Sequence, residues 1–311
     1  MPDAHVGVPG RDDDFDGVDD GADNCPGLFN PDQKDVDHDG IGNPCDAVVD
    51  DRDGDNVPDV ADPFPDDPQR PGVVNAATVY AHTSTELYYL EVKTGDVYLV
   101  DAFHWPADAS SREMTDIAID RFGVLYGISF ADVFAIDPQT AQCWRLAPLP
   151  QEFNGLTMVP ADLLGQADDM LVGISNEGGW WRLQLVPTVP PSAQQRVQLT
   201  FFGQYGSSWT SSGDAFSIVG VGTFATVDTA SDDRDYLVAI DPTTGAVSQT
   251  IGRITGFDSV YGLAGWRDKA FAFDASGEVM VLDLTTGAIV TRKQTGHAWW
   301  GAGVRTILDD Q

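Results

Sequence analysis

A two-strand pattern recurs along the last three-quarters of the chain and limits the folds open to it. Each copy has an apolar strand, an acidic residue, a Thr-Gly-like turn and a second strand. Short apolar runs joined by turn residues are typical of β-hairpins, and helical periodicity is essentially absent here, so we expect an all-β domain. The copies read YYLEVKTGDVYLV (88–100), VFAIDPQTAQCWRL (133–146), LVAIDPTTGAVSQT (237–250) and VMVLDLTTGAIVTR (279–292).

The spacing of these copies narrows the choice of fold. Their acids, Glu91, Asp137, Asp241 and Asp283, stand 46, 104 and 42 residues apart, and the middle interval equals two periods of 52. We therefore expect one diverged copy near residues 180–199, where a Pro-rich insertion replaces the short turn. Periods of this length are typical of β-propellers. A β-sandwich would fit the density of strands but not the repeat.

A strand rich in small residues accompanies each hairpin and completes the predicted blade. Small residues suit the crowded axis of a radial repeat. Five inner strands and five hairpins predict a five-bladed β-propeller over residues 76–308. Because the last inner strand follows every hairpin, we expect a composite closing blade built from both ends of the domain. The inner strands read MTDIAI (114–119), FNGLTMV (153–159), SGDAFSI (212–218), VYGLAGW (260–266) and WWGAGV (299–304).

The first 70 residues have a different composition, with 21 Asp, no Glu and four Lys or Arg, which leaves −17 of the chain's net charge of −32. Three stretches place oxygen-bearing side chains at positions 1, 3, 5, 9 and 12 of a twelve-residue calcium loop, and position 7 offers its carbonyl. Position 6 must turn sharply, which suits Gly17, Gly40 and, less well, Asn56. The predicted ligands are Asp12, Asp14, Asp16, Val18, Asp20 and Asp23; Asp35, Asp37, Asp39, Ile41, Asn43 and Asp46; and Asp51, Asp53, Asp55, Val57, Asp59 and Asp62.

The spacing predicts at least three Ca²⁺ ions as cofactors. Crowded carboxylates repel one another unless such a cation lies between them. The alternative is a disordered, solvated acidic tail, which does not require this register. Pro and Gly flank the loops, so we expect no bracketing helices and a segment whose folding free energy comes largely from metal binding.

Residues 12–46 resemble a thrombospondin type 3 repeat, and residues 51–68 resemble the partial repeats that end such arrays in bacterial secreted proteins. The run DDDFDGVDDGADNCPGLFNPDQKDVDHDGIGNPCD carries the likeness, with Asn43 and Asn56 as departures. The resemblance implies a calcium-dependent, extracellular, non-catalytic module with a Cys25–Cys45 disulfide. The hairpins similarly resemble those of bacterial extracellular propellers, the PQQ-like and WD40-like kinds, which implies architecture alone.

The domain plan follows from these patterns. We expect an extracellular or cell-surface location, because a disulfide and calcium loops suit an oxidising, calcium-rich setting. The opening MPDAHVG is not a signal peptide, and no apolar run predicts membrane insertion. The strong negative charge disfavours nucleic acid, and we expect a monomer. Cys143 is predicted to be a buried free thiol. The predicted parts are a disordered N-terminus (1–10), calcium-binding repeats (11–68), a linker (69–75) and the propeller (76–308).

Candidate site residues in the propeller lie at the starts of the inner strands. Asp116 and Asp214 are weak catalytic candidates, as a carboxylate pair flanking a glycosidic bond; the alternative is that they accept hydrogen bonds from blade-tip turns. Trp299, Trp300, Tyr261 and Asn154 are candidates for ligand binding at the mouth of the axis, although most such aromatic residues pack between blades.

Two functions remain open from the sequence. The first is a secreted adhesion or recognition protein, in which a calcium-rigidified stalk presents a propeller that binds an extracellular glycan or protein. The second is a secreted propeller enzyme acting on glycans, as a hydrolase or lyase. The absence of an assembled catalytic set in the sequence favours the first.

Overall fold

The structure, a computed structural model, describes residues 11–35, 40–45, 65, 74, 78–166, 169–186, 196–229 and 232–308. The chain divides into two compact units, Met1–Gly72 and Val73–Gln311, and each is considered by itself. The strands of the described residues all belong to the second unit, and the helix found there, α1, is a single turn at Ala161–Leu164. Across the described ranges, no helix is long and apolar enough to cross a membrane.

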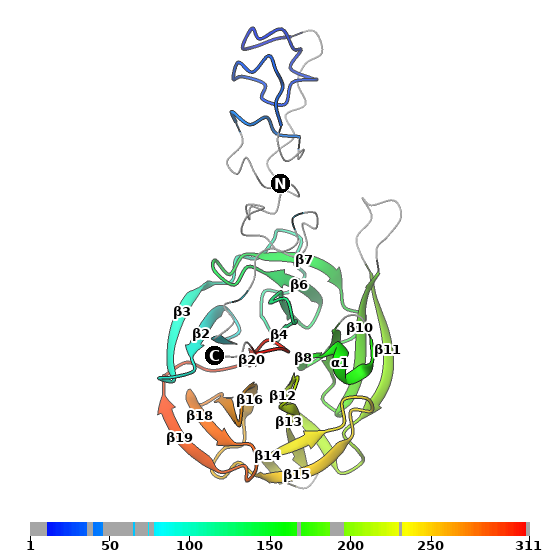
Figure 1. Ribbon diagram of the computed structural model, residues 1–311, viewed down its shortest axis with the longest axis vertical. Helices are drawn as coiled ribbons and strands as arrows, with labels where there is room; N and C mark the ends of the chain where they lie inside the picture. The colour runs from blue at the N-terminus through cyan, green and yellow to red at the C-terminus, as the bar shows by residue number, and fades with distance from the viewer. Residues whose placement is uncertain are drawn as a thin grey trace. The chain divides into compact units, whose positions relative to one another are not determined.

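Five four-stranded antiparallel sheets make up the second unit, and Figure 1 shows them as the blades of a ring. We number the blades in chain order of their innermost strands, which are labelled nearest the middle of that view. Blade 1 is β4 (Asp116–Ile119), β5 (Leu125–Ile128), β6 (Asp132–Ile136) and β7 (Cys143–Pro148). Blade 2 is β8 (Gly155–Val159), β9 (Met170–Ile174), β10 (Gly179–Val186) and β11 (Arg196–Gln204).

The other three blades have the same order from the axis outward, so the predicted all-β, five-bladed propeller is confirmed. Blade 3 is β12 (Trp209–Ile218), β13 (Gly222–Thr229), β14 (Asp232–Ile240) and β15 (Val247–Arg253). Blade 4 is β16 (Val260–Trp266), β17 (Lys269–Asp274), β18 (Glu278–Asp283) and β19 (Ile289–Gln294). Blade 5 is β20 (Gly301–Gly303), β1 (Thr78–His82), β2 (Glu86–Glu91) and β3 (Asp96–Ala102).

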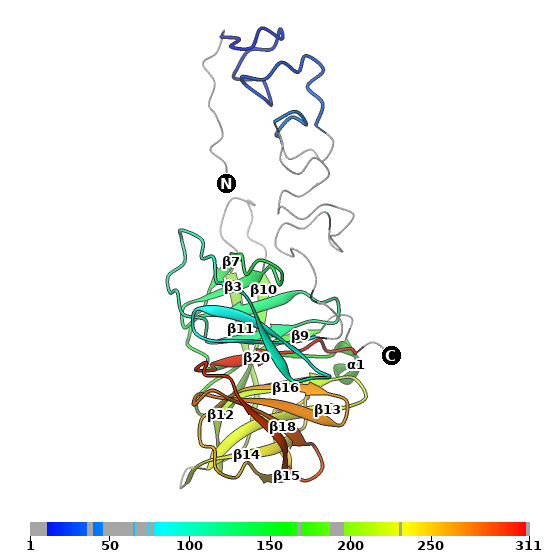
Figure 2. The same ribbon diagram turned by 90° about the vertical axis from the view of Figure 1, so that its left-hand side faces the viewer.

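Blade 5 closes the ring with strands from both ends of the domain, as the order of the repeats predicted. The last strand, β20, pairs antiparallel with the first, β1, with Ala302 opposite Ala81 and Gly301 opposite His82. In Figure 2 the red β20 can be followed at the level of the cyan N-terminal strands. Closure leaves no free inner edge between the first and last blades.

Small residues let the inner strands approach one another more closely than side chains would permit. A Cβ atom on Gly155 would lie 2.4 Å from the carbonyl oxygen of Gly213, and one on Gly213 would lie 2.6 Å from that of Tyr261. A Cβ atom on Gly262 would lie 2.8 Å from the carbonyl carbon of Gly301. These glycines therefore serve close backbone contact at the axis.

The recurring acid and Thr of the hairpins hold the turn between the two outermost strands. The Thr140 hydroxyl donates to Asp137 at 2.7 Å, and the Thr286 hydroxyl donates to Asp283 at 3.0 Å. The turn then needs a left-handed residue, which is Gly287 (φ 70°) in one copy and the less suitable Ala141 (φ 57°) in another. The diverged copy predicted near 180–199 is the β10–β11 hairpin, whose tip lies outside the described residues.

Apolar side chains fill the spaces between blades. Trp299, fully buried, packs edge-to-face against Tyr88 and Phe273, with ring centroids 5.1 and 5.5 Å apart. Cys143 is buried and free, as predicted, and burial raises the pKa of its thiol. The propeller therefore has a core of its own, built from aromatic and aliphatic residues of neighbouring sheets.

Candidate functional site

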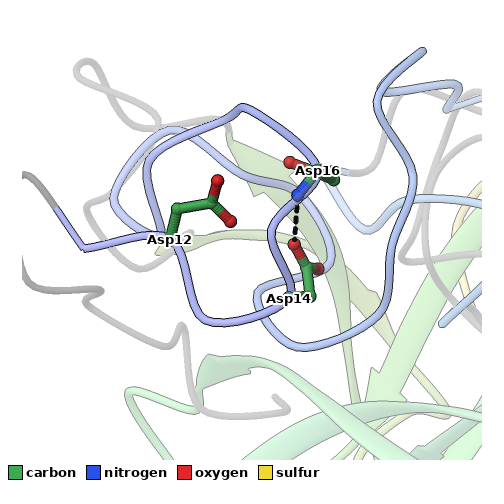
Figure 3. Close-up of side chains that lie close together, drawn as sticks. All are labelled: Asp12, Asp14 and Asp16. Carbon is green, nitrogen blue, oxygen red and sulfur yellow. Dashed lines mark hydrogen bonds between the residues drawn. The ribbon is translucent and has the colours of Figure 1, made fainter.

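Three carboxylates of the first acidic loop converge in the N-terminal unit. Asp12, Asp14 and Asp16 each offer an oxygen, and these atoms all lie within 4.8 Å of one another. Figure 3 shows the three side chains on one turn of the loop, where the backbone N–H of Asp16 donates to Asp14 Oδ1 at 3.2 Å. They are positions 1, 3 and 5 of the predicted calcium loop, and a hard cation is the partner that such oxygens prefer.

The sixth residue of the loop makes the turn that brings these carboxylates together. Gly17 has a left-handed φ of 98°, and its N–H donates to Asp12 Oδ2 at 3.0 Å. The second loop repeats this geometry: Gly40 has a φ of 93°, and its N–H donates to Asp35 Oδ2 at 3.1 Å. Two loops in the predicted register thus share one local conformation, which requires glycine at the turn.

The later positions of the first loop lie outside the group of three carboxylates. Asp20 Oδ1 accepts the backbone N–H of Asp13 at 2.9 Å, and Asp23 Oδ1 accepts the N–H of Cys25 at 2.8 Å. The backbone N–H of Val18 donates to Asp16 Oδ1 at 2.8 Å. The donor set fits a calcium ion at positions 1, 3 and 5, while Asp20 and Asp23 are engaged with the backbone of the loop and its continuation.

The other predicted loops are only partly visible. Asp35, Ile41 and Asn43 of the second loop are described, and the N–H of Asn43 donates to the carbonyl of Lys34 at 2.9 Å. The remaining predicted ligands lie outside the described residues: Asp37, Asp39, Asp46, Asp51, Asp53, Asp55, Val57, Asp59 and Asp62.

A disulfide joins Cys25 to Cys45, as the resemblance to thrombospondin type 3 repeats implied. It closes a loop across a sequence separation of 20 residues. Inside this loop, the Gln33 side-chain amide donates to Asp23 Oδ1 at 2.8 Å. The backbone N–H of Asn30 donates to Asp16 Oδ2 at 3.0 Å. The cross-link thus ties the second loop to the residues that support the first.

In the propeller, Asp116 and Asp214 meet at the axis, and we call them the axial carboxyl pair. Asp116 begins β4 of blade 1, and Asp214 lies in β12 of blade 3. Both are 0% exposed; burial raises the pKa of each carboxyl group, and the nearby charge of Asp214 raises that of Asp116 further. The sequence signal is that each follows a small residue at the same level of an inner strand, where blades 2, 4 and 5 carry Gly155-Leu156, Gly262-Leu263 and Gly301-Ala302.

Every blade donates one backbone N–H to the axial carboxyl pair. Asp116 accepts from Ile117 at 2.9 Å and from Leu156 at 2.5 Å. Asp214 accepts from Ala215 at 2.5 Å, from Leu263 at 2.8 Å and from Ala302 at 3.3 Å. These donors belong to β4, β8, β12, β16 and β20. The pair therefore accepts its hydrogen bonds from the inner strands themselves, which corrects the alternative that blade-tip turns supply them.

His82 of β1 lies against the same pair. Its Nδ1 is 2.8 Å from the carbonyl oxygen of Thr83, which can only accept, so Nδ1 carries the proton. The unprotonated Nε2 is buried, has no hydrogen-bond partner and lies 3.8 Å from Asp116 Oδ1. Burial lowers the pKa of His82 to about 4. Gly301 permits this approach, since a Cβ atom there would lie 2.4 Å from His82 Nε2.

The described inner strands enclose little space next to the axial carboxyl pair. A cavity of about 10 Å³ lies among the inner strands, close to the space of a single water molecule. The segment after β20 crosses the other ends of these strands: the N–H of Val219 donates to the Thr306 carbonyl at 2.9 Å, and the Thr306 hydroxyl donates to Asp169 at 2.5 Å. This cavity is too small for a sugar ring.

The predicted aromatic and amide residues at the mouth of the axis divide into two groups. Asn154, Tyr261 and Trp300 directly precede the inner-strand glycines of blades 2, 4 and 5, so they share one level of the ring. Tyr261 is 39% exposed, while Asn154 and Trp300 are half-buried. Trp299, in contrast, is fully buried in the core. Its expected part in ligand binding does not fit this position, because no ring face is left for a ligand.

Sequence reasoning did not find His82 as a neighbour of Asp116, nor the five N–H donors. His82 lies on β1, the second strand of its blade, and nothing in the sequence around it indicates this contact. Alignment of the inner strands shows that Asp116 and Asp214 occupy equivalent positions in their strands. It does not show that the five N–H groups point at them, because that depends on closure of the ring.

No protein-family model matches the chain, and no curated protein sequence is similar to it. Several solved structures are similar to the chain at low identity. A protein of unknown function from Bacteroides caccae is 11% identical, covering 70% of this chain and 73% of its own, with a TM-score of 0.37. Hydrazine synthase from Kuenenia stuttgartiensis is 12% identical, covering 72% and 85%, with a TM-score of 0.42. The Dos1 propeller is 13% identical, covering 71% and 63%, with a TM-score of 0.35.

Proposed function

We propose that the chain is a secreted, calcium-binding recognition protein, in which the acidic module binds Ca²⁺ and the propeller binds an extracellular glycan or protein. The observation that carries the calcium part is the convergence of Asp12, Asp14 and Asp16 within 4.8 Å, in the predicted register. Carboxylates held this close repel one another, and a divalent cation between them removes that cost.

Calcium would be held first by these three side chains. The turn at Gly17 fixes Asp12, because both the Phe15 and the Gly17 N–H groups donate to its carboxylate, at 2.7 and 3.0 Å. The bound ion supplies charge neutralisation and rigidity to a segment with little apolar burial. The Cys25–Cys45 disulfide supports a location outside the reducing cytoplasm.

The proposed binding role of the propeller rests on the burial of its axial acids and on the small cavity beside them. The acids that would serve a glycosidase are fully buried and saturated by backbone N–H groups, and a cavity of about 10 Å³ does not admit a sugar. Recognition therefore belongs to the outer surface or to the mouth, where Tyr261 is exposed and Trp300 is half-buried. Aromatic side chains at such places are frequent contributors to binding.

The calcium part is tested by titrating the calcium-free full chain with Ca²⁺ in a calorimeter. Asp14→Asn and Asp16→Asn should each weaken binding about tenfold or more, since a charged ligand is lost. Asp19→Asn is the matched control: it makes the same charge change in the same loop, at position 8, which supplies no ligand. Equal losses in all three variants would show general charge attraction and would contradict a specific site.

The recognition part is tested by applying the full chain to an array of glycans and extracellular proteins, with and without calcium. We expect binding that Trp300→Ala or Tyr261→Ala weakens. Absence of binding in every condition, together with turnover of a glycan substrate, would instead support the secreted enzyme that the sequence left open.

A further inference from the structure

The axial carboxyl pair makes an arrangement that two ionised carboxylates cannot hold. Asp116 and Asp214 are fully buried, and both approach β20 at consecutive residues: a Cβ atom on Gly301 would lie 2.2 Å from Asp116 Oδ1, and the Ala302 N–H donates to Asp214 Oδ2 at 3.3 Å. A carboxylate only accepts hydrogen bonds, so two neighbouring carboxyl groups can bond to each other only when one of them carries a proton. Two like charges in contact inside a protein are also strongly unfavourable.

Backbone N–H groups, one histidine and one tyrosine surround the axial carboxyl pair. The five backbone N–H groups, one from each inner strand, donate to the carboxyl oxygens and favour negative charge on them. The titratable neighbours are His82, whose unprotonated Nε2 faces Asp116, and Tyr205, which is 2% exposed. β8, β16 and β20 contribute only backbone N–H groups of apolar residues. A neutral histidine and a neutral tyrosine leave the proton to the pair.

We propose that Asp116 and Asp214 hold one proton between them and act as a protonation-dependent lock on the closed ring. With the proton in place, a single hydrogen-bonded pair joins the inner strands of all five blades, including β20, which closes the ring. Without the proton, the two buried anions repel each other, and this repulsion destabilises the closed ring.

The direction of the effect follows from the pKa shifts. Burial raises the pKa of both Asp116 and Asp214 well above the usual range, and the charge of Asp214 raises that of Asp116 further. The folded state therefore keeps a proton that the unfolded chain releases just above the ordinary pKa of Asp. The contribution to stability is complete below that value and is lost as the pH rises through the folded-state pKa.

The test is chemical unfolding of the full chain at a series of pH values from 5 to 8, at constant calcium, followed by tryptophan fluorescence. All eight Trp lie between residues 105 and 300, so the signal reports the propeller alone. Each proton that the folded state retains makes the unfolding equilibrium constant rise about tenfold per pH unit. Asp116→Asn and Asp214→Asn should each reduce this dependence by about tenfold per pH unit, because the amide cannot release the shared proton.

Asp258→Asn is the matched control, because it makes the same substitution at an exposed position, and it should keep the wild-type dependence. If both axial variants also keep it, the pair holds no proton and the proposal is overturned. Should these variants fail to fold, the infrared band of a protonated carboxyl group decides in the folded wild type at neutral pH. The band should persist in Asp235→Asn, which removes the other raised carboxyl group; its absence there would overturn the proposal.

Discussion

Each of the two units of this chain is stabilised by a different kind of interaction. In the described part of the N-terminal unit, the buried side chains are Cys25 and the polar Asp16, Asp20 and Asn30, while Phe15 is 84% exposed. In the propeller, clusters of aromatic and aliphatic side chains fill the spaces between sheets. The same polypeptide therefore combines a segment organised by carboxylates and a cross-link with a domain organised by apolar burial.

The two units also differ in the surroundings of their carboxylates. Among the described residues of the N-terminal unit, the carboxylates of Asp12, Asp14 and Asp16 converge with no apolar core around them. The axial carboxyl pair is fully buried among the inner strands of the propeller and accepts backbone N–H groups.

Removal of calcium should produce the largest difference in behaviour between the two units. In chelator, amide hydrogens of residues 11–35 should lose their protection from exchange, because nothing apolar replaces the ion. Propeller amides and the tryptophan-monitored unfolding transition should stay unchanged. The measurement is hydrogen exchange by mass spectrometry on the full chain, with sodium chloride added to match ionic strength. Equal protection of residues 11–35 with and without chelator would contradict the calcium assignment.

The reverse effect should come from Trp299→Ala. The side chain is fully buried against Tyr88 and Phe273, so its loss should lower the free energy of unfolding of the propeller by about 3–5 kcal/mol. Calcium affinity should not change. Trp300→Ala is the control next in the chain, and because Trp300 is only half-buried, a smaller loss is expected in the same denaturant titration. A loss as large as that of Trp299→Ala would place Trp300 in the core as well.

Loss of the cross-link should weaken the N-terminal unit alone. A loop closed across 20 residues is worth about 3 kcal/mol by chain entropy, so Cys25→Ser with Cys45→Ser should lower calcium affinity about a hundredfold. Calorimetric titration of the double variant measures this. Cys143→Ala removes the free thiol instead and should leave calcium affinity as it is. If the double variant binds calcium normally, the loops are organised without the disulfide.

The smallest effect expected is a pH dependence from Asp235 of β14. Its carboxyl accepts hydrogen bonds from the Ser212 hydroxyl and from the Val260 N–H at 2.7 Å, and burial raises its pKa to about 8. Because the folded value exceeds the unfolded one, stability falls as the pH rises toward 8 and levels off above it. Asp235→Asn should flatten this fall by about 1.4 kcal/mol between pH 6 and 7. An unchanged slope would show that the carboxyl is ionised throughout.

The propeller could be predicted from the sequence because its hairpins repeat the same acid and Thr in the same turn. Asp137 with Thr140, and Asp283 with Thr286, make the same turn, so the period was visible without any knowledge of packing. The composite blade followed from the order of inner strands and hairpins. The second strand of each blade, such as β5 or β9, carries no such turn signal and was not assigned from the sequence.

The candidate sites were predictable only as far as local spacing determines them. The turn at Gly17 and the convergence of Asp12, Asp14 and Asp16 follow from a twelve-residue pattern. The meeting of Asp116 with Asp214 and His82 depends on strands that are distant in sequence and become neighbours only when the ring closes. The burial of Trp299 beside the half-buried Trp300 likewise depends on which side of β20 faces a neighbouring blade.

The pairing of β20 with β1 also sets an order of events during synthesis. Blade 5 lacks its innermost strand until residues 301–303 have left the ribosome, and Asp214 lacks the N–H of Ala302 until then. The strands β1 to β19 therefore emerge as an open arc in which β1 lacks its inner partner. We expect the propeller to mature in one late step, and a chain stopped a few residues early to remain an unclosed arc.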